Sequence, residues 1–159
     1  MAEKKYYLGV DGGGSKTTTV VFNDKGEFIC KACGESINYY SVGMENARKA
    51  MADIIESMPQ KSFDCAVIGM SALNERASDE ETAKFCSGVI DSKKIIMDSD
   101  LYVALEAMDE DGECAVVISG TGSMALHRNE KGEIVDKLYA AHNGQMIALE
   151  TAEKGILVN

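Results

Sequence analysis

The sequence predicts an α/β fold, in which a five-stranded mixed sheet with helices on both faces is followed by the opening strands of a second, incomplete domain. Three observations favour it. Strands and helices are expected in the order βββαβαβα, and two short strands, over 66–70 and 94–97, are expected to be buried on both faces. A strand, a glycine turn and two further strands then recur in the last third of the chain. We place the first domain at residues 1–111 and the second at 112–159.

Three antiparallel strands open the chain. The first, over 6–11, is a short apolar run that ends in glycines, and the second, over 16–23, is rich in Thr and Val, which suit a pleated surface. A turn at 24–27 has Gly26 at the position that needs a positive φ angle. Residues 28–33 return as the third strand, so a hairpin joins the last two strands.

Helices and buried strands alternate in the next part of the chain. Apolar residues recur at three- and four-residue spacing up to Pro59, which predicts a helix that the proline closes. A later helix is marked by Ser78 as its N-cap, followed by acidic residues in its first turn. The expected segments are a helix over 44–58, a strand over 66–70, a helix over about 78–89, a strand over 94–97, and a helix that Ser99 or Asp100 caps and that runs to about 108.

The order of elements seen at the start of the chain begins again after a polar linker at 109–112. Strands are expected over 114–119, 124–128 and 134–139, with a glycine turn and a hairpin between them. The tail is expected to form a helix that covers these strands, because Met146, Leu149 and Ala152 have helical spacing.

Charge and cysteine content narrow the class of function. The chain has 159 residues, with 26 acidic and 16 basic side chains and a formal charge of −10. A net anion is repelled by nucleic acids and anionic membranes, so neither is expected as a main partner. The five cysteines are an odd number and no signal peptide precedes them, which predicts a reduced, cytoplasmic protein. Cys30 and Cys33 fall on one strand and so point to opposite sides, which favours ordinary thiols over a metal pair.

A run of three glycines between the first two strands is the strongest chemical motif. It is Asp11-Gly12-Gly13-Gly14-Ser15-Lys16-Thr17. Glycines let backbone N–H groups approach phosphate oxygens closely. Asp11, at the end of a buried strand, suits Mg²⁺, and Ser15, Lys16 and Thr17 add donors for a phosphoryl group. The alternative is a glycine-rich hairpin that binds nothing.

A second glycine turn occupies the matching position of the repeat. It is Gly120-Thr121-Gly122-Ser123, and alone it is a weak signal that a plain turn also explains. Two such turns facing each other across a cleft would hold a nucleotide triphosphate from both sides.

Several motifs, in order along the chain, resemble one known family. They are residues 8–17, Ser36-Ile37-Asn38, Gly69-Met70-Ser71-Ala72, Asp98-Ser99-Asp100 and residues 118–123. Together they resemble the BadF/BadG/BcrA/BcrD ATPase family, which includes N-acetylglucosamine kinases, within the superfamily of sugar kinases, heat-shock proteins and actin. The resemblance implies a ribonuclease H-like, actin-like ATPase domain, an ATP-dependent sugar kinase activity, and ATP and Mg²⁺ as cofactors.

The same resemblance assigns roles to single residues. Asn38 matches the asparagine that holds the sugar, although a loop asparagine in an Asx-turn is the plain alternative. Asp100 matches the catalytic base, and Asp98 is a rival for that role. A carboxylate at a strand end can take the proton of a sugar hydroxyl while ATP supplies the phosphoryl group. Ser71 is placed beside the sugar or the phosphates.

The sequence departs from the family's pattern after residue 139. The Gly-Gly-Trp-Gly and Gly-Asp-Glu-Gly-Ser segments of family kinases are replaced by residues 140–146 and 149–155. The expectation is a chain that stops before an adenosine pocket, has little kinase activity alone, and self-associates into a homo-oligomer through 113–159. Two other functions stay open: an activator ATPase of an acyl-CoA reductase or dehydratase, and a non-catalytic domain that binds sugar or phosphate.

Overall fold

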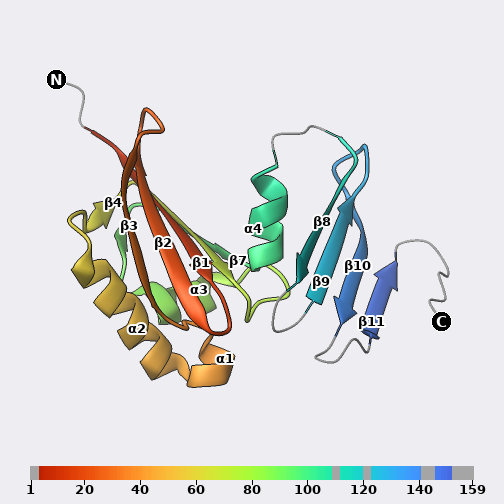
Figure 1. Cartoon of the computed structure of the whole chain (residues 1–159), viewed down its shortest axis with the longest axis horizontal. Coiled ribbons are helices and arrows are strands. Elements are labelled where there is room, and N and C mark those ends of the chain that lie inside the picture. Colours follow the sequence, from red (N-terminus) through yellow and green to blue (C-terminus); the bar gives the residue numbers. More distant parts are fainter. Residues whose placement is uncertain (1–3, 109–111, 120–122, 141–145, 152–159) are drawn as a thin grey trace. The chain divides into compact units, whose positions relative to one another are not determined.

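The computed structural model describes residues 4–108, 112–119, 123–140 and 146–151 (Figure 1). The chain divides into two compact units, Met1–Val103 and Ala104–Asn159. The domain boundary between residues 111 and 112 stays a prediction.

A five-stranded mixed sheet with the order β3-β2-β1-β5-β7 forms the first unit. Its strands are β1 (Tyr6–Gly12), β2 (Lys16–Asn23), β3 (Phe28–Glu35), β5 (Cys65–Met70) and β7 (Ile95–Asp98). Strands β1, β2 and β3 are antiparallel neighbours, whereas β5 lies parallel to β1 and β7 parallel to β5. The predicted mixed sheet with three antiparallel N-terminal strands is therefore confirmed.

Helices lie on both faces of this sheet. They are α1 (Tyr39–Val42), α2 (Met44–Ser57), α3 (Asp79–Cys86) and α4 (Asp100–Glu106). The apolar side of α2 buries Ala47, Met51 and Ile54 on the face to which Leu8 and Val10 of β1 also contribute. The first turn of α4 lies at Gly69 of β5, whose side-chain position points to the other face.

The predicted helices begin and end close to the expected residues. Helix α2 ends at Ser57, just before Pro59, and Ser78 caps α3 by accepting a hydrogen bond from the Glu81 N–H at 3.2 Å. Ser99 caps α4, because its hydroxyl accepts from the Tyr102 N–H at 3.2 Å. The short helix α1 and a small parallel pair, β4 (Ser62–Phe63) with β6 (Asp91–Ser92), were not predicted.

One arginine fastens α2 to the end of α3. The Arg48 guanidinium donates to the carbonyl oxygens of Lys84, Phe85 and Ser87, at 2.6, 2.8 and 2.8 Å. The last carbonyls of a helix have no partner within the helix, so Arg48 satisfies groups that would otherwise depend on water.

The second unit contains an antiparallel sheet with the order β11-β10-β9-β8. Its strands are β8 (Cys114–Ser119), β9 (Ser123–Arg128), β10 (Ile134–Ala140) and β11 (Met146–Thr151). The first three strands confirm the prediction. The expected helix is wrong over Met146–Thr151, because this segment pairs with β10 as a strand. A short apolar run fits the residue spacing of a helix as well as that of a strand. Here the segment forms a strand because it pairs with the edge of β10. Ala152 lies outside the described residues.

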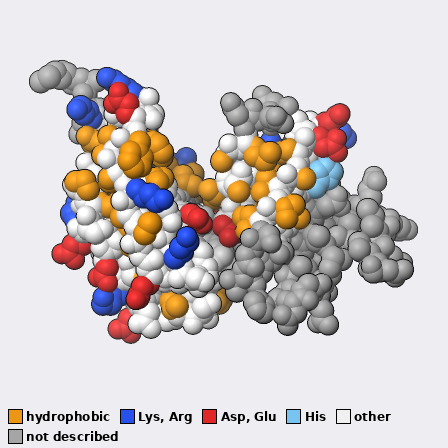
Figure 2. Space-filling model, viewed as in Figure 1, with side chains coloured by type: hydrophobic (Ala, Val, Ile, Leu, Met, Phe, Trp, Pro, Cys, Tyr) orange, Lys and Arg blue, Asp and Glu red, His pale blue; other side chains and the backbone are white. Residues whose placement is uncertain are grey.

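Part of the surface of the first unit is apolar. Figure 2 shows hydrophobic side chains gathered over β1 to β3. The exposed large hydrophobic residues of these strands are Tyr7, Phe22, Phe28 and Ile29. The Phe22 and Phe28 rings meet edge to face, with centroids 6.0 Å apart. In the described part of the chain, none of the helices has the length and apolar character that crossing a bilayer requires.

Candidate active site

The predicted site residues follow strands that end at one edge of the first sheet. Strand β3 runs in the same direction as β1, since both are antiparallel to β2, and β5 and β7 are parallel to β1. Asp11 lies at the end of β1, Asn38 after β3, Ser71 after β5 and Asp100 after β7. Ligands of open α/β sheets bind at this carboxyl edge, so the topology gathers the predicted residues there.

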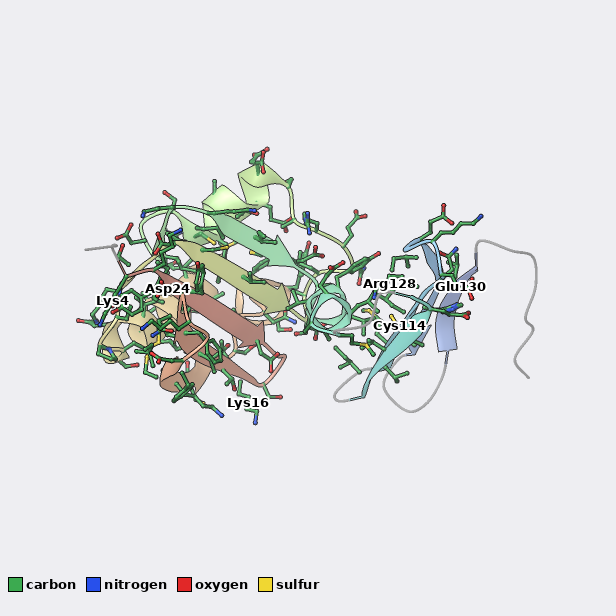
Figure 3. All side chains as sticks on the ribbon, turned by 90° about the horizontal axis from the view of Figure 1, so that it is seen from above. Lys4, Lys16, Asp24, Cys114, Arg128 and Glu130 are labelled. Carbon is green, nitrogen blue, oxygen red and sulfur yellow. The ribbon has the colours of Figure 1, made fainter. Side chains whose placement is uncertain are left out.

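The glycine turn after β1 leaves two of its amides available. The Gly13 N–H donates to the Lys16 carbonyl at 3.0 Å and so closes the turn. The Gly14 and Ser15 N–H groups have no acceptor among the described residues. Figure 3 shows Lys16 at the opposite end of the hairpin from Asp24 and Lys4. The turn therefore offers two N–H groups and a nearby cation to an anion.

Gly12 is required by packing rather than by a ligand. A Cβ atom on Gly12 would lie 2.8 Å from the Ile37 side chain and 3.1 Å from the Gly69 carbonyl oxygen. Real Cβ atoms essentially never come within 3.0 Å of such a neighbour, and a contact of 3.1 Å is tighter than nine in ten real ones. The segment after β3 thus packs directly on the end of β1.

A chain of hydrogen bonds links the glycine turn to Asn38 and Ser71. The buried Ser36 hydroxyl donates to the Gly13 carbonyl at 2.9 Å and accepts from the Asn38 N–H at 3.1 Å. The Asn38 side-chain amide donates to Ser71 Oγ at 3.3 Å, and the Ser71 N–H donates to the Gly12 carbonyl at 2.9 Å. We call these residues, Gly12, Gly13, Ser36, Asn38 and Ser71, the polar ring. Ser36 belongs to one of the sequence motifs, but its anchoring role was not predicted.

Asn38 also caps the helix that follows it. Its Oδ1 accepts from the Ser41 N–H at 3.2 Å, which is the Asx-type contact expected of a loop asparagine. Its Nδ2 points instead to Ser71. The two ends of the amide thus serve different neighbours, and the capping contact fixes the side chain in place.

Asp100 lies close to Asp11 because a glycine lets α4 approach the sheet. A Cβ on Gly69 would be 3.2 Å from the Asp100 Cα, and Gly69 is the register partner of Asp11. Burial raises the pKa of Asp100, and the negative charge of Asp11 raises it further, while the Leu101 amide acts in the opposite direction. A half-buried carboxylate with a raised pKa is suited to accept a proton.

Asp98, the rival carboxylate, is occupied by other contacts. It is only 4% exposed, and its Oδ2 accepts from Arg76 Nε at 3.0 Å. Its Oδ1 accepts from the Ser99 N–H at 2.8 Å. Both oxygens and the charge of Asp98 therefore have partners within the protein.

Some predicted residues do not join this group. Thr17 is fully buried, and its hydroxyl donates to the Glu35 carbonyl at 2.7 Å, so it faces the core rather than the turn. Gly120, Thr121 and Gly122 lie outside the described residues, and so does the side chain of Ser123, whose backbone begins β9.

Two carboxylates, rather than a ready-made metal cage, lie at this edge of the sheet. Among the described residues, no three His, Cys, Asp or Glu side chains gather closely enough to hold a metal ion. The Asp11 carboxylate is exposed and takes part in no hydrogen bond or ion pair with another described residue. Mg²⁺ commonly binds through one or two carboxylates and the oxygens of substrate phosphates, and Asp11 beside Asp100 fits that pattern.

The fold defines the general class of protein. The mixed sheet, with the glycine turn after its first strand, is the fold of actin-like ATPases and sugar kinases. One solved structure of this fold is a protein from Chromobacterium violaceum, provisionally named an N-acetylglucosamine kinase, with a TM-score of 0.63 and 20% identity. The match covers 84% of this chain and 48% of that one.

The chain belongs to the BadF/BadG/BcrA/BcrD ATPase family, whose model matches residues 8–148. It is 26% identical over 145 residues to N-acetyl-D-glucosamine kinase of Dictyostelium discoideum, covering 81% of this chain and 45% of the relative. It is 29% identical over 136 residues to N-acetylmuramic acid/N-acetylglucosamine kinase of Clostridium acetobutylicum, covering 80% and 44%. The chain thus spans about half the length of the curated relatives it matches.

Proposed function

We propose that this chain is the sugar-binding and phosphate-binding part of an ATP-dependent kinase that phosphorylates N-acetylglucosamine or a closely related amino sugar. The observation that carries the proposal is the polar ring, which fixes Asn38 and Ser71 relative to the glycine turn. The names of two relatives, both of them kinases of N-acetylglucosamine, support the substrate class.

Asn38 and Ser71 are the proposed sugar ligands. A sugar hydroxyl that replaces or joins the 3.3 Å contact between them would accept from the amide and donate to the serine oxygen. Hydrogen bonds of this kind distinguish a sugar from an apolar ligand of the same size, because burying these groups without partners is costly.

Asp100 is the proposed general base. Its carboxylate takes the proton of the attacking sugar hydroxyl as the phosphoryl group leaves ATP. The raised pKa makes Asp100 a better proton acceptor than an ordinary aspartate. Asp98 is left out of this role because Arg76 and the Ser99 amide occupy it.

The glycine turn is the proposed phosphate site. The Gly14 and Ser15 N–H groups, the Ser15 hydroxyl and the Lys16 ammonium would contact phosphate oxygens, and Asp11 would hold Mg²⁺. Bound Mg²⁺ would neutralise charge on the phosphates. The second turn, Gly120 to Ser123, is proposed as a further nucleotide-binding segment, and Thr17 is omitted because its hydroxyl is buried. A cytoplasmic location and a homo-oligomer formed through 113–159 remain predictions.

Binding is the direct test, because the chain spans about half the length of the relatives. Isothermal titration with N-acetylglucosamine should show that Asn38→Ala lowers affinity about tenfold or more, as the loss of a hydrogen bond worth about 1.4 kcal/mol would. Asn38→Ser restores the helix cap without restoring the amide, so it should bind as weakly as the alanine variant. Wild-type affinity in both variants would contradict the proposal.

A further inference from the structure

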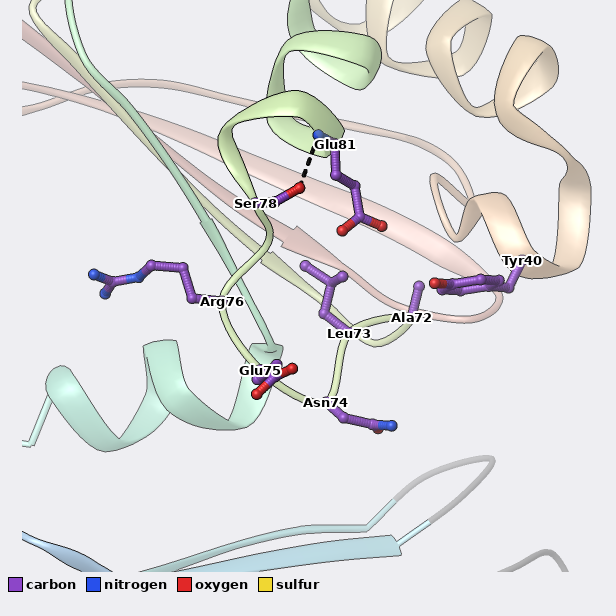
Figure 4. Close-up of a pocket in the computed structure, with 8 residues that line it drawn as sticks. All are labelled: Tyr40, Ala72, Leu73, Asn74, Glu75, Arg76, Ser78 and Glu81. Atoms are coloured by element: carbon purple, nitrogen blue, oxygen red, sulfur yellow. Dashed lines mark hydrogen bonds between the residues drawn. The ribbon is translucent and has the colours of Figure 1, made fainter.

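A pocket lies next to the proposed sugar ligands without containing them. Its volume is about 410 Å³, within the range of small-molecule sites. It is lined by Tyr40, Ala72, Leu73, Asn74, Glu75, Arg76, Ser78 and Glu81 (Figure 4). Tyr40 is two residues after Asn38, and Ala72 directly follows Ser71. A group attached to a sugar held by Asn38 and Ser71 therefore has this pocket as its neighbour.

The pocket offers an aromatic surface to its occupant. Tyr40 is 73% exposed, the largest exposure among the exposed large hydrophobic side chains described. Its ring is supported by Tyr39, with centroids 5.0 Å apart and planes tilted by 47°. An aromatic ring combines a large apolar face with a low entropic cost of ordering. The C–H face of a pyranose ring is an apolar surface of matching shape.

Polar groups of fixed position surround that aromatic surface. The Tyr39 hydroxyl donates to Glu81 Oε1 at 2.6 Å, which orients this carboxylate within the lining. Ser78 accepts from the Glu81 N–H and still has a hydroxyl proton to donate. The Asn74 side-chain amide has no hydrogen bond to another described residue. Donors and acceptors placed around an aromatic face match a ligand with many hydroxyl groups.

The charges of the lining favour a neutral occupant. Glu75 and Glu81 are both acidic, and the one cation of the lining, Arg76, is paired with Asp98. Figure 4 shows the Arg76 guanidinium directed away from Tyr40 and Glu81. An anionic group in the pocket would therefore meet two carboxylates without a cation that faces it.

We propose that this pocket binds a second, neutral sugar ring linked to the amino sugar, so that the protein binds an amino-sugar disaccharide more tightly than the monosaccharide. The inference rests on the proposed function for the position of the first ring. Neither the family match nor the names of the relatives assigns a role to the pocket.

Calorimetry with two neutral probes tests the pocket. N,N′-diacetylchitobiose should bind about tenfold or more tightly than N-acetylglucosamine, because a further 1.4 kcal/mol of contact corresponds to a factor of ten. Tyr40→Ala should remove this gain and leave monosaccharide affinity within about twofold, since Tyr40 lines the pocket and Asn38 and Ser71 do not. Tyr40→Phe keeps the ring and should keep most of the gain. Tyr7→Ala, at another exposed tyrosine, should change neither affinity.

The outcomes separate this inference from the proposed function. Equal affinities for the two probes, or a gain that survives Tyr40→Ala, overturn the pocket assignment and leave the monosaccharide site standing. A Tyr40-dependent affinity for the disaccharide that Asn38→Ala does not weaken supports the pocket and overturns the proposed function. Binding of neither probe overturns both. A preference for N-acetylmuramic acid, whose lactyl group is anionic, over the disaccharide would also contradict the pocket assignment.

Discussion

The Asn38 side-chain amide donates a hydrogen bond to Ser71 Oγ at 3.3 Å, across 33 residues of sequence. This contact joins the segment after β3 to the segment after β5. Because Ser36 ties the same segment to the glycine turn, one set of hydrogen bonds connects the sugar and phosphate parts of the proposed site. Kinase chemistry depends mainly on how the reacting groups are positioned. The hydrogen bonds that hold the site residues in place therefore matter as much as the residues that would contact the sugar and the phosphates.

The charge of Asp11 should be detectable in the titration of Asp100. Asp11→Asn removes one of the two causes that raise the Asp100 pKa, so this pKa should fall, while burial continues to raise it. NMR titration of the Asp100 side-chain carboxyl carbon measures it directly. Glu45, an exposed acid on α2, gives a matched control variant, Glu45→Gln. An unchanged Asp100 pKa in the Asp11 variant would show that the two carboxylates do not interact.

The same raised pKa has a consequence for stability. The folded state binds the Asp100 proton more tightly than the unfolded state does, so stability falls as the pH rises through the interval between the two pKa values. Asp100→Asn should therefore raise the free energy of unfolding at pH 7, and the difference should vanish below the usual pKa of aspartate. Urea unfolding at both pH values measures this. A variant that is less stable at pH 7 would contradict the argument.

Asp98→Asn should have the opposite effect on stability. It weakens a buried, charge-assisted contact with Arg76, so we expect a loss of about 1–3 kcal/mol in the free energy of unfolding. The exposure of Arg76 places the loss toward the lower end. Urea unfolding of the two variants side by side gives opposite signs if Asp98 is structural and Asp100 belongs to the site. Equal signs would remove this basis for choosing Asp100.

Two glycines of the same turn should respond differently to alanine. Gly12→Ala forces a Cβ to within 2.8 Å of Ile37, and overpacking of this kind costs about 1–3 kcal/mol. Gly14→Ala meets nothing within 4 Å, so stability should change by less than about 0.5 kcal/mol. Thermal unfolding of both variants measures the contrast. Equal losses would show that the turn itself, rather than contact with Ile37, demands glycine.

Arg48→Ala should loosen α3 from α2. Three carbonyl oxygens lose their donor, and we expect a loss of about 1–3 kcal/mol in the free energy of unfolding. The neighbouring Lys49→Ala removes only an exposed pair with Asp53, which water screens, so the loss should be much smaller. Denaturant unfolding of both variants tests the difference, and a Lys49 loss as large as that of Arg48 would contradict it.

Much of the fold could be predicted because the spacing of apolar residues indicates where most of its helices and strands lie. Helix α2 and strand β5 are regular patterns, and Ser78 marks the start of α3 by its capping chemistry. The face of β2 was less certain, since Thr and Val occur at both odd and even positions. The register of β2 against β1 places the Thr17 side chain toward the core, and the local pattern of β2 does not reveal this register.

The site could be predicted as a set of residues but not as a network. Asn38, Ser71 and Asp100 each follow a strand, and parallel strands bring such residues to one edge. The anchoring role of Ser36 depends on a contact 23 residues away, which no local pattern reveals. The choice between Asp98 and Asp100 likewise depends on Arg76, which reaches Asp98 from a loop.

The most direct test of the proposed sugar site is an NMR titration of the labelled chain with N-acetylglucosamine. Saturable shifts of the Asn38 side-chain amide and the Ser71 backbone amide are predicted, with no shift of the Asn46 side-chain amide, which bonds to Val42 on the surface. Signals of Asn38 and Ser71 that stay unmoved at millimolar sugar, or that move equally with glycerol, would contradict the assignment of this chain as an amino-sugar-binding part of a kinase.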